Sequence, residues 1–491
     1  MSLREYHYEV ESRHDCPLVV DLDGTLTPAD TLVESLIQLI KRTPLNLLLL
    51  PFWLLKGRAA FKAAVASRTS IAVDRLPYHE SLLAYLLSEK KKGRRIILAT
   101  AAHKSIAEGV SAHLGLFDHV LATDAGRNLK SKAKLEAIRE EVGEKFVYAG
   151  DSHADIPIWR GAQAAILVGV SSGLTESIRR YVPIEQEFPT EAIGLAVWLR
   201  ALRVYQWLKN MLLFVPALTS FSFMEMGGLT TVVVAFLAFS FAASATYIVN
   251  DLWDLENDRA HRRKRLRPFA SGTIPILYGL AVAVSALFLA FVLAMYVSTG
   301  FFQILLLYVV LTSAYSWVLK EYVLIDVLLL SLLYTLRILA GSIAIGVTAS
   351  SWLLAFSVFM FLSLALVKRC AELVSLDQIG GKGTRGRDYR VTDLVVLWPL
   401  GVGAALSAVV VFGLFISAPQ TQVRYATPQL LWLVAIGLTY WLSRLWIKTS
   451  RGEMHDDPMI YAISNPNSLI TVVLMIATTL AAHFLSLGST P

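Results

Sequence analysis

Three aspartates at the end of a long apolar run are the residues of this chain best suited to chemistry. Asp251, Asp254 and Asp258 follow an apolar segment that begins near Gly228. On a helix, which advances about 100° per residue, their side chains fall within roughly 60° of one another, so their oxygens converge. Such a cluster repels itself unless a cation shares it. The spacing therefore predicts Mg²⁺ holding a phosphorylated substrate at a membrane surface.

A dense cationic loop follows these aspartates. Its basic residues are Arg259, His261, Arg262, Arg263, Lys264, Arg265 and Arg267. Cations beside carboxylates can bind phosphates that Mg²⁺ bridges, and we consider Lys264 and Arg267 candidates for this role. For Arg262, Arg263 and Arg265 we prefer a simpler explanation, in which positive charge sets the orientation of the membrane helices.

A second acidic pair follows an apolar run near the N-terminus. Residues 17–20 read as a buried parallel strand, and Asp21 and Asp23, two residues apart, face one site after it. Three further strand-like runs cover residues 95–100, 146–151 and 164–169. Polar groups come after the second and third of the four strands, where ligands bind in a doubly wound sheet. The pattern predicts an α/β domain with its site at the carboxyl ends of the strands.

Four motifs in order over about residues 17–180 resemble the haloacid dehalogenase superfamily of phosphohydrolases. They are Asp21-x-Asp23-Gly-Thr, Thr100, a lysine near 130–134, and Gly150-Asp151-Ser-His-Ala-Asp155. The resemblance implies that Asp21 is a nucleophile that forms an aspartyl-phosphate and that Asp23 is the acid and base. It implies that Thr100 and the lysine hold phosphoryl oxygens. The implied Mg²⁺ ligands are Asp21, Asp23, Asp151 and Asp155.

The motif lysine has three candidates, Lys130, Lys132 and Lys134. We favour Lys134, at the start of a helix expected over residues 133–141. A carboxylate attacks phosphorus only if a metal and a cation neutralise the oxygens that it approaches, so the lysine is needed for catalysis. A degenerate head that has lost catalysis is the alternative.

Composition divides the chain into two parts. Its 491 residues are 55% hydrophobic with a mean hydropathy of +0.54, too apolar for an ordinary soluble protein. We expect a phosphatase-like domain at 1–182 with a helical cap at about 31–80, a linker at 183–200, and an all-α membrane domain at 201–491. Apolar segments of membrane-spanning length predict about nine helices, at roughly 203–224, 228–250, 277–297, 300–319, 323–346, 351–371, 394–416, 429–448 and 468–487.

Basic residues gather in alternate loops of the expected membrane domain, after the second, fourth, sixth and eighth spans, whereas the opposite loops offer little beyond Arg424. This asymmetry, and a polar N-terminus without a signal peptide, predict an integral protein of the inner (plasma) membrane with a cytoplasmic head. A formal charge of +7 fits anionic lipid and phosphate rather than nucleic acid. Cys16 and Cys370 are the only cysteines, which excludes a disulfide framework.

The expected cap contains an apolar run at residues 45–55, flanked by Lys41, Arg42, Lys56 and Arg58. It is too short to cross a bilayer, but it could lie on the membrane surface. A buried cap helix is an equally good interpretation of the run. A cap that faces lipid would suit a lipid-linked phosphate as the substrate of the head.

The motif Asn250-Asp251-x-x-Asp254-x-x-x-Asp258 resembles the first aspartate-rich motif of the UbiA superfamily of intramembrane prenyltransferases, whose architecture has nine helices. The resemblance extends over about residues 200–490. Within that superfamily the chain is most similar to the branch of the decaprenyl-phosphate phosphoribosyltransferases. The residues that carry this similarity are Arg203-Val-Tyr-Gln-Trp-Leu-Lys209-Asn210, Asp258-Arg-x-His261, Lys264, Arg267-Pro-x-Ala-Ser-Gly272, Lys368-Arg369-x-x-Glu372 and Gly452-Glu-Met-His-Asp-Asp-Pro458.

The loop after the sixth span departs from the pattern of aromatic prenyltransferases. Their second Asp-x-x-x-Asp motif is replaced by Asp377, Asp388 and Asp393 at other spacings, among Lys382, Arg385, Arg387 and Arg390. A more basic loop suits a donor with one more phosphate, such as phosphoribosyl pyrophosphate. The candidate substrate-binding residues are Lys209, Asn250, Lys264, Arg267, Lys368, Arg369, Arg387 and Tyr389. Asp326 and Arg337, in or beside the fifth span, either pair structurally or line the site.

We therefore expect Mg²⁺-dependent transfer of phosphoribose from phosphoribosyl pyrophosphate to a polyprenyl phosphate, followed by dephosphorylation of the lipid-linked product by the head. One alternative is prenyl transfer to an aromatic or other small acceptor, with the head acting on pyrophosphate. Another is a transporter with a regulatory head, although no inverted repeat is visible. The sequence leaves a homo-oligomer open.

Overall fold

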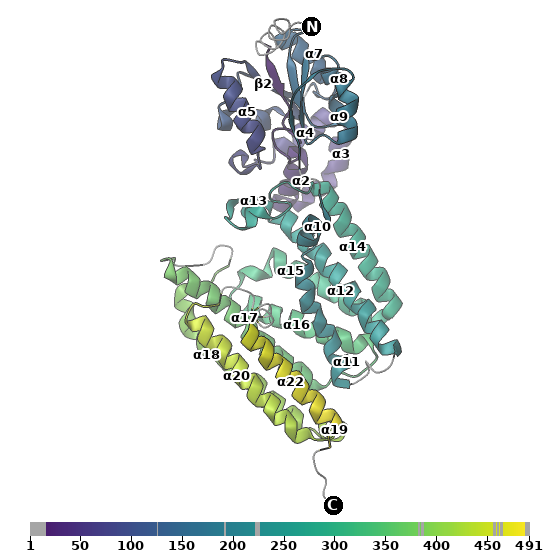
Figure 1. Cartoon of the computed structure of the whole chain (residues 1–491), viewed down its shortest axis with the longest axis vertical. Coiled ribbons are helices and arrows are strands. Elements are labelled where there is room, and N and C mark those ends of the chain that lie inside the picture. Colours follow the sequence, from purple (N-terminus) through teal and green to yellow (C-terminus); the bar gives the residue numbers. More distant parts are fainter. Residues whose placement is uncertain are drawn as a thin grey trace, which may run out of the picture. The chain divides into compact units, whose positions relative to one another are not determined.

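The computed structural model describes residues 16–486 apart from 125, 191–192, 221–225, 382, 384–386, 455–457, 459–460 and 462–464 (Figure 1). The chain forms two compact units. Unit 1 comprises Met1–Arg203 and Tyr247–Val284, and unit 2 comprises Val204–Thr246 and Ser285–Pro491. We describe each unit by itself.

A six-stranded parallel sheet forms the centre of the head, the part of unit 1 before residue 203. The strand order β3-β2-β1-β4-β5-β6 is that of a doubly wound fold, as the strand pattern predicted. The strands are β1 (Leu18–Val20), β2 (Ile96–His103), β3 (His119–Thr123), β4 (Val147–Gly150), β5 (Ala164–Val168) and β6 (Ile184–Phe188).

The central strand β1 lies between β2 and β4. Val20 pairs with Leu98 on one side and with Ala149 on the other. The amide of Asp21 continues the ladder and donates to the carbonyl of Ala149 over 3.1 Å. Because parallel strands end at the same edge, the residues after β1 and β4 are neighbours.

Strands β3 and β6 were not predicted. Their residues are mostly half-buried or exposed, and both strands lie at edges of the sheet, so neither has the apolar run of a central strand. Strand β6 falls in the segment predicted as a linker, at 183–200. Its Glu185 accepts hydrogen bonds from the buried Arg94 (2.5 Å) and from Tyr85 (2.5 Å), which ties this segment to the head.

Helices cover both faces of the sheet because alternate strand residues point to opposite sides. On one face, Leu18 and Val20 pack with helices α5 (Glu80–Lys91) and α6 (Lys104–Leu114). On the other, Val19 packs in a second core to which α7, α8 and α9 contribute. These helices are α7 (Lys132–Val142), α8 (Ile156–Trp159) and α9 (Ser172–Arg179), with η3 (His153–Asp155) before α8.

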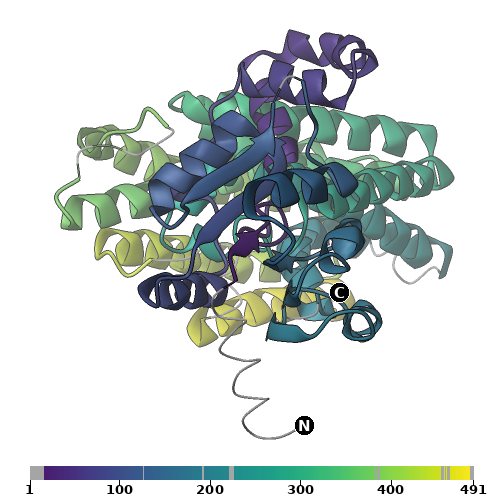
Figure 2. The same cartoon turned by 90° about the horizontal axis from the view of Figure 1, so that it is seen from above.

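The segment between β1 and β2 forms the predicted helical cap, whose helices gather at one edge of the head (Figure 2). Asp30 caps the first of them by accepting hydrogen bonds from the amides of Leu32 and Val33. The elements before α5 are α2 (Thr31–Arg42), η1 (Pro44–Leu49), α3 (Leu50–Leu55), α4 (Arg58–Ala66) and η2 (Val73–Arg75).

Eight helices among the described residues are long and apolar enough to cross a membrane. They are α12 (Met226–Trp253), α14 (Ile276–Val297), α15 (Thr299–Trp317), α16 (Ile325–Ala344), α17 (Ser351–Gln378), α18 (Leu394–Ser417), α20 (Leu431–Ser450) and α22 (Pro466–Phe484). Their bounds agree closely with eight of the nine predicted spans, and this is an integral membrane protein of all-α type in this part of the chain.

The predicted span at 203–224 does not form one long helix in the described residues. It is divided into η4 (Val204–Leu213) and α11 (Phe214–Ser220), after α10 (Leu195–Ala201). Polar contacts explain the irregular backbone, because Trp207 donates to Ser244 (2.9 Å) and Asn210 to Ser240 (3.1 Å). Gly341 of α16 packs so closely on Leu213 that a Cβ would overlap its carbonyl.

Short elements complete the fold. In unit 1, α13 (Leu255–Ala260) and η6 (Lys264–Leu266) lie between α12 and α14. In unit 2, the connecting elements are η7 (Leu319–Glu321), η8 (Val391–Asp393), α19 (Pro419–Arg424) and η9 (Pro428–Leu430). Three apolar cores pack unit 2 in its described residues, and they contain Phe239 and Phe301, Phe361 and Trp446, and Ile416 and Tyr425.

Candidate functional site

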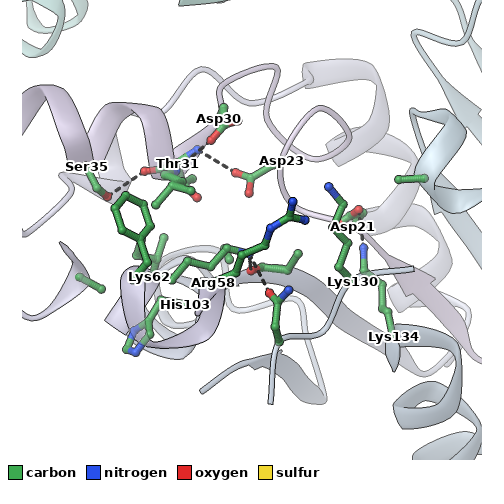
Figure 3. A pocket seen from close by; sticks show the side chains of 18 of the residues that line it. Asp21, Asp23, Asp30, Thr31, Ser35, Arg58, Lys62, His103, Lys130 and Lys134 are labelled. Carbon is green, nitrogen blue, oxygen red and sulfur yellow. Dashed lines mark hydrogen bonds and ion pairs between the residues drawn. The ribbon is translucent and has the colours of Figure 1, made fainter. Parts of the chain in front are cut away.

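A pocket of about 520 Å³ lies in the head, between the carboxyl ends of β1, β2 and β4 and the cap (Figure 3). Asp21, Asp23, Lys134, Asp151 and Asp155 all line it. Five residues from three separate sequence motifs therefore meet in one cavity.

Asp21 is held in a fixed orientation at the floor of this pocket. Its Oδ1 accepts a hydrogen bond from the amide of Leu22 (2.8 Å), and its Oδ2 lies 2.6 Å from Nζ of Lys134. Of the three candidate lysines, Lys134 makes this contact; Lys130 lines the pocket at another point, and Lys132 is exposed.

The Asp21–Lys134 pair is buried, with 8% and 3% of the two residues exposed. Burial, opposed by Lys134, raises the pKa of Asp21 above its ordinary value. Burial lowers the pKa of Lys134, but the charges of Asp21 and Asp155 outweigh this and leave the pKa raised. The lysine therefore stays charged beside the carboxylate.

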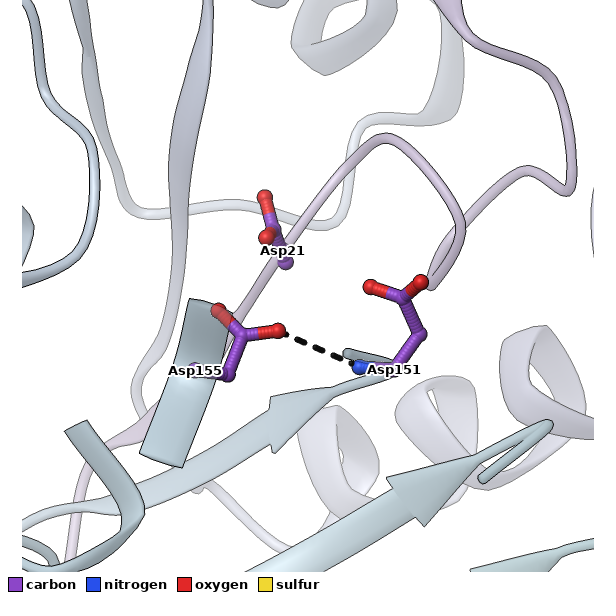
Figure 4. Close-up of side chains that lie close together, drawn as sticks. All are labelled: Asp21, Asp151 and Asp155. Carbon is purple, nitrogen blue, oxygen red and sulfur yellow. Dashed lines mark hydrogen bonds between the residues drawn. The ribbon is translucent and has the colours of Figure 1, made fainter. Parts of the chain in front are cut away.

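Asp21, Asp151 and Asp155 form the one group of three carboxylates, within the described part of the chain, whose ligand atoms all lie within 4.8 Å of one another (Figure 4). Burial and the charges of Asp155 and Asp21 raise the pKa of Asp151 to about 7. Three crowded oxygens with this mutual repulsion form a donor set that a hard divalent cation fits. Mg²⁺ binds carboxylate oxygens, so these three side chains would accommodate it.

Asp23 lines the same pocket but is not one of these three residues. Its Oδ1 accepts from the amide of Thr31 at the first turn of α2 (2.9 Å). Burial and the charge of Asp30 raise the pKa of Asp23 to about 7. A carboxyl group with such a pKa can both donate and accept a proton near neutral pH.

Thr100 and Gly24 do not line the pocket, but each lies against a residue that does. Thr100 is 0% exposed, and its hydroxyl oxygen accepts from the amide of Ala102 (3.0 Å), a residue that lines the pocket. Gly24 has a φ of +79°, and a Cβ there would overlap the carboxylate of Asp151. Only glycine allows the turn after Asp23 to approach Asp151 this closely.

Three residues that line the pocket, and Tyr148, which contacts its lining, were missed by the sequence reasoning. The hydroxyl of Tyr148 donates to Asp155 (2.9 Å) and lies 3.0 Å from Lys134. Lys62 of α4 donates to the carbonyl of Ala101 (2.6 Å) and to Asn128 (3.0 Å). Arg58 and His103 also line the cavity. Tyr148 sits in a strand and Arg58 and Lys62 in the cap, so no local spacing linked them to the acidic motifs.

The aspartates at 251 and 258 converge on an arginine. Nη1 of Arg267 contacts Oδ1 of Asp251 (3.1 Å) and Oδ2 of Asp258 (2.5 Å), and Arg203 also binds Asp251. Both carboxylates are buried, at 3% and 2% exposure. The guanidinium of Arg267 lies between the carboxylates of Asp251 and Asp258, so the negative charge there favours a cation.

The other candidates of unit 1 are close to this cluster in the sequence. Asp254 lies between α12 and α13, its amide bonded to the carbonyl of Asn250 (2.9 Å). Asn250 and Asp254 are half-buried and Lys264 is exposed. The predicted convergence holds for Asp251 and Asp258 through Arg267, but the three aspartates together do not form a group of carboxylates within 4.8 Å of one another, and α12 itself ends at Trp253.

A further charged cluster lies inside unit 2 and is centred on Asp326. Arg369 donates to Asp326 (2.5 Å) and to Glu372 (2.5 Å), and the hydroxyl of Tyr389 donates to the other oxygen of Asp326. Arg369 and Tyr389 are each 1% exposed. Arg369 and Tyr389, two predicted substrate-binding residues, are therefore both bound to Asp326. The sequence had left open whether Asp326 pairs with Arg337 or lines the site.

Arg337, the other charged residue of the fifth predicted span, does not pair with Asp326. It binds Asn210 (2.9 Å) and Tyr308 (3.0 Å) and so is structural. Lys209 lies over the ring of Tyr334, 5.7 Å from its centre, and Arg387 lies 3.7 Å from Glu372. Lys368 is half-buried on α17. Lys382 and Arg385 lie outside the described residues.

Comparison with known proteins places these observations in two families. A sequence model of the UbiA prenyltransferase family matches residues 213–465, just over half of the chain, and a model of the haloacid dehalogenase-like hydrolases matches residues 18–160. Both families agree with the resemblances seen in the motifs.

Three relatives illustrate the range of similar proteins. The uncharacterized protein y4nM of Sinorhizobium fredii is 38% identical over 92% of this chain and 88% of its own length. The nodulation protein NoeC of Azorhizobium caulinodans is 34% identical over 57% of this chain and 91% of its own. The decaprenyl-phosphate phosphoribosyltransferase of Corynebacterium glutamicum is 32% identical over 46% of this chain and 69% of its own length. The chain therefore belongs to the UbiA prenyltransferase family and carries a haloacid dehalogenase-like hydrolase domain ahead of its membrane helices.

Proposed function

We propose that the membrane part of this enzyme transfers phosphoribose from phosphoribosyl pyrophosphate to a polyprenyl phosphate, and that the head then removes the phosphate from the lipid-linked product. The observation that supports this most is the presence of two acidic clusters with their own cations in one chain: Asp21 with Lys134, and Asp251 and Asp258 with Arg267. Similarity to a decaprenyl-phosphate phosphoribosyltransferase supports the choice of donor and acceptor.

The proposed transfer needs no general base. A polyprenyl phosphate is anionic at neutral pH, so one of its oxygens attacks the anomeric carbon while the bond from that carbon to pyrophosphate breaks. Asp251, Asp254 and Asp258 would hold Mg²⁺, which supplies positive charge for the departing pyrophosphate. Arg267 and Arg203, which bind Asp251 and Asp258 in the structure, would supply positive charge for phosphate oxygens beside these carboxylates.

Residues of unit 2 take two different roles in this proposal. Lys209, Lys368 and Arg387 are candidate phosphate contacts of unit 2, and Asn250 and Lys264 are candidate phosphate contacts of unit 1. Arg369 and Tyr389 act as positioning residues, because both are buried and bound to Asp326. They tie α17 and the loop that follows it to Asp326 of α16.

In the head, Asp21 attacks the phosphorus of a phosphate monoester in line with the leaving oxygen. The P–O bond to the alcohol breaks, Asp23 gives that oxygen a proton, and Asp21 carries the phosphoryl group. Water then attacks the phosphorus with Asp23 as base, which releases phosphate and restores Asp21. Lys134 and Thr100 position the phosphoryl oxygens, and Asp21, Asp151 and Asp155, with Asp23 nearby, would hold Mg²⁺ for charge neutralisation.

The test uses the full chain in lipid nanodiscs with Mg²⁺, labelled phosphoribosyl pyrophosphate and decaprenyl phosphate. We expect labelled polyprenyl-phosphoryl ribose, which has lost the 5-phosphate of its ribose. Asp21→Asn should instead accumulate polyprenyl-phosphoryl ribose 5-phosphate. Absence of any labelled lipid product would refute the proposed transfer. An identical phosphorylation state in the wild type and in Asp21→Asn would refute the role of the head.

A second candidate is prenyl transfer to an aromatic or other small acceptor, which the name of the matching family model favours. The same nanodiscs, given a prenyl diphosphate and an aromatic acid, distinguish the two. Under the first proposal no prenylated acceptor forms, and its formation together with no reaction of phosphoribosyl pyrophosphate would establish the second.

The alternation of basic loops supports a cytoplasmic position for the head and for the aspartate-rich loop in the inner membrane. Labelling of a cysteine introduced at the exposed Lys264 by a membrane-impermeant reagent, in spheroplasts and in inverted vesicles, tests the side: only inverted vesicles should react.

A further inference from the structure

The cap carries an apolar surface that the head leaves uncovered. It consists of η1 and α3, residues Pro44–Leu55, none of which is buried. We name it the leucine ridge. Its most exposed large side chains are Leu45 (79%), Leu48 (71%), Phe52 (63%) and Leu55 (85%). A contiguous apolar surface of this kind on a protein marks a binding surface rather than a random exposure.

The N-terminal end of the leucine ridge lies beside the end of a membrane helix. Lys41, in the last turn of α2, donates to the carbonyl of Trp253 over 3.1 Å and lies 6.0 Å from the centre of its indole ring. Trp253 is the last residue of the apolar helix α12. Tryptophan at the end of a membrane helix belongs to the headgroup region. The ridge begins three residues after Lys41 and thus starts at that level.

Cations flank the leucine ridge on both sides. Lys41 and Arg42 precede it and Lys56 and Arg58 follow it, and all four are exposed. An apolar helical surface with basic ends is the chemistry of a segment that lies in the interface of a bilayer containing anionic lipid. A protein partner would not require this charge pattern, and a buried cap helix is excluded by the exposure of the ridge.

The other end of the leucine ridge reaches the pocket of the head. Leu54 lines that pocket together with Arg58 and Phe61 of the next helix, α4. Arg68 stacks on the ring of Trp53, 4.7 Å from its centre, and so fixes α3 against α4. One apolar surface therefore runs from the end of a membrane helix to the rim of the cavity that contains Asp21.

We propose that the leucine ridge inserts into the membrane interface and delivers lipid-bound phosphate monoesters to the pocket of the head, with the lipid chain remaining in the bilayer. This inference rests on the proposed phosphatase function of the head, which it deepens by assigning the surface that brings the lipid-linked substrate to the pocket. A lipid-linked substrate confined to the same surface meets the pocket at a high effective concentration, whereas a soluble monoester does not.

The first experiment measures insertion and does not depend on catalysis. Both native cysteines are buried, so Leu48→Cys can be labelled selectively with an environment-sensitive fluorophore in the full chain. The protein is placed in vesicles of phosphatidylcholine and phosphatidylglycerol that contain a lipid with a quencher on its acyl chain. We expect strong quenching at position 48 and little at Leu87→Cys, a control on the exposed face of α5 (48% exposed). Equal, weak quenching at both positions would overturn the insertion.

The second experiment measures delivery. The triple variant Leu45→Ser, Leu48→Ser, Leu55→Ser is compared with Leu87→Ser on two substrates: ribose 5-phosphate in solution and polyprenyl-phosphoryl ribose 5-phosphate in vesicles. We expect the triple variant to lose about tenfold or more in kcat/KM on the lipid only. Unchanged rates on both substrates would overturn the delivery. If the wild type hydrolyses neither of the two substrates, the phosphatase function is refuted. The quenching at position 48 would still decide whether the leucine ridge inserts.

Discussion

The guanidinium of Arg259 binds the carboxylate of Glu34 through two hydrogen bonds, 2.8 Å from Nη1 to Oε2 and 2.6 Å from Nη2 to Oε1. Only 6% and 8% of the two side chains are exposed. Glu34 belongs to cap helix α2, and Arg259 directly follows Asp258 in α13. A two-point pair of this kind sets the orientation of both groups. The cap of the head is thereby joined to the turn that carries the second acidic cluster.

We predict that Glu34→Gln lowers the transferase activity by about tenfold or more. Loss of the carboxylate leaves a buried guanidinium without its charge partner, and the turn that holds Asp258 shifts from its position. The measurement is transfer of labelled phosphoribose in nanodiscs. Arg263→Gln, at an exposed arginine of the same loop, is the control. Recovery in the exchanged pair Glu34→Arg, Arg259→Glu would support the ion pair, and wild-type activity of Glu34→Gln would contradict it.

Removal of the candidate nucleophile should separate the two activities. Asp21→Asn is expected to lower phosphatase activity by more than about a thousand-fold, because an amide cannot attack phosphorus. Transfer to the lipid should continue at the wild-type rate, seen as accumulation of the phosphorylated lipid by mass spectrometry. Loss of both activities in a folded protein would show that the division of labour proposed for the two sites is wrong.

Lys134→Met should lower phosphatase activity by about a hundred-fold or more, because Lys134 is the cation 2.6 Å from Asp21 in a buried pocket. Lys132→Met changes an exposed lysine two residues away in the same helix and should leave the rate unchanged. The comparison decides which of the neighbouring lysines serves the site. Equal effects of the two substitutions would point to the helix rather than to the individual side chain.

The three crowded carboxylates predict a pH-dependent effect of Mg²⁺ on stability. The pKa of Asp151 is raised to about 7 in the folded protein, well above its value of about 3.9 in an unfolded chain. The folded state therefore holds more protons between these pH values, and metal-free stability falls as the pH rises towards and through 7. We expect Mg²⁺ to raise the unfolding temperature more at pH 8 than at pH 6, and Asp151→Asn to remove the difference. An equal effect of Mg²⁺ at both pH values would argue against this site.

In unit 2, Asp326→Asn should destabilise the protein by about 3–5 kcal/mol, because it leaves Arg369 buried without one of its two carboxylates. Tyr389→Phe removes the hydrogen bond to Asp326 and the one that the hydroxyl accepts from the amide of Leu324 (2.9 Å), and should cost about 1–3 kcal/mol. The measurement is the thermal unfolding of the purified chain in detergent. A fully stable Asp326→Asn protein with reduced transfer would instead assign Asp326 to substrate binding.

Local patterns were enough to predict much of this protein. Eight membrane helices followed from the length of their apolar runs, since a bilayer requires about 20 apolar residues whatever surrounds them. The central strands β1 and β4 and the acidic residues after them followed in the same way, because buried parallel strands are continuous apolar runs and their carboxyl ends form the site. The choice of Lys134 relied on its place in a helix.

Tertiary structure decided what depends on distant partners. Strand β6 has an exposed, polar sequence, and only its pairing with β5 and the contact of Glu185 with Arg94 make it part of the head. The exposure of the leucine ridge could not be read from its composition, because a buried and a membrane-bound helix are equally apolar. For the opening aspartates, the sequence determined that Asp251 and Asp258 converge, and the fold decided that Arg267 lies between them, since a loop brings that cation back to the carboxylates.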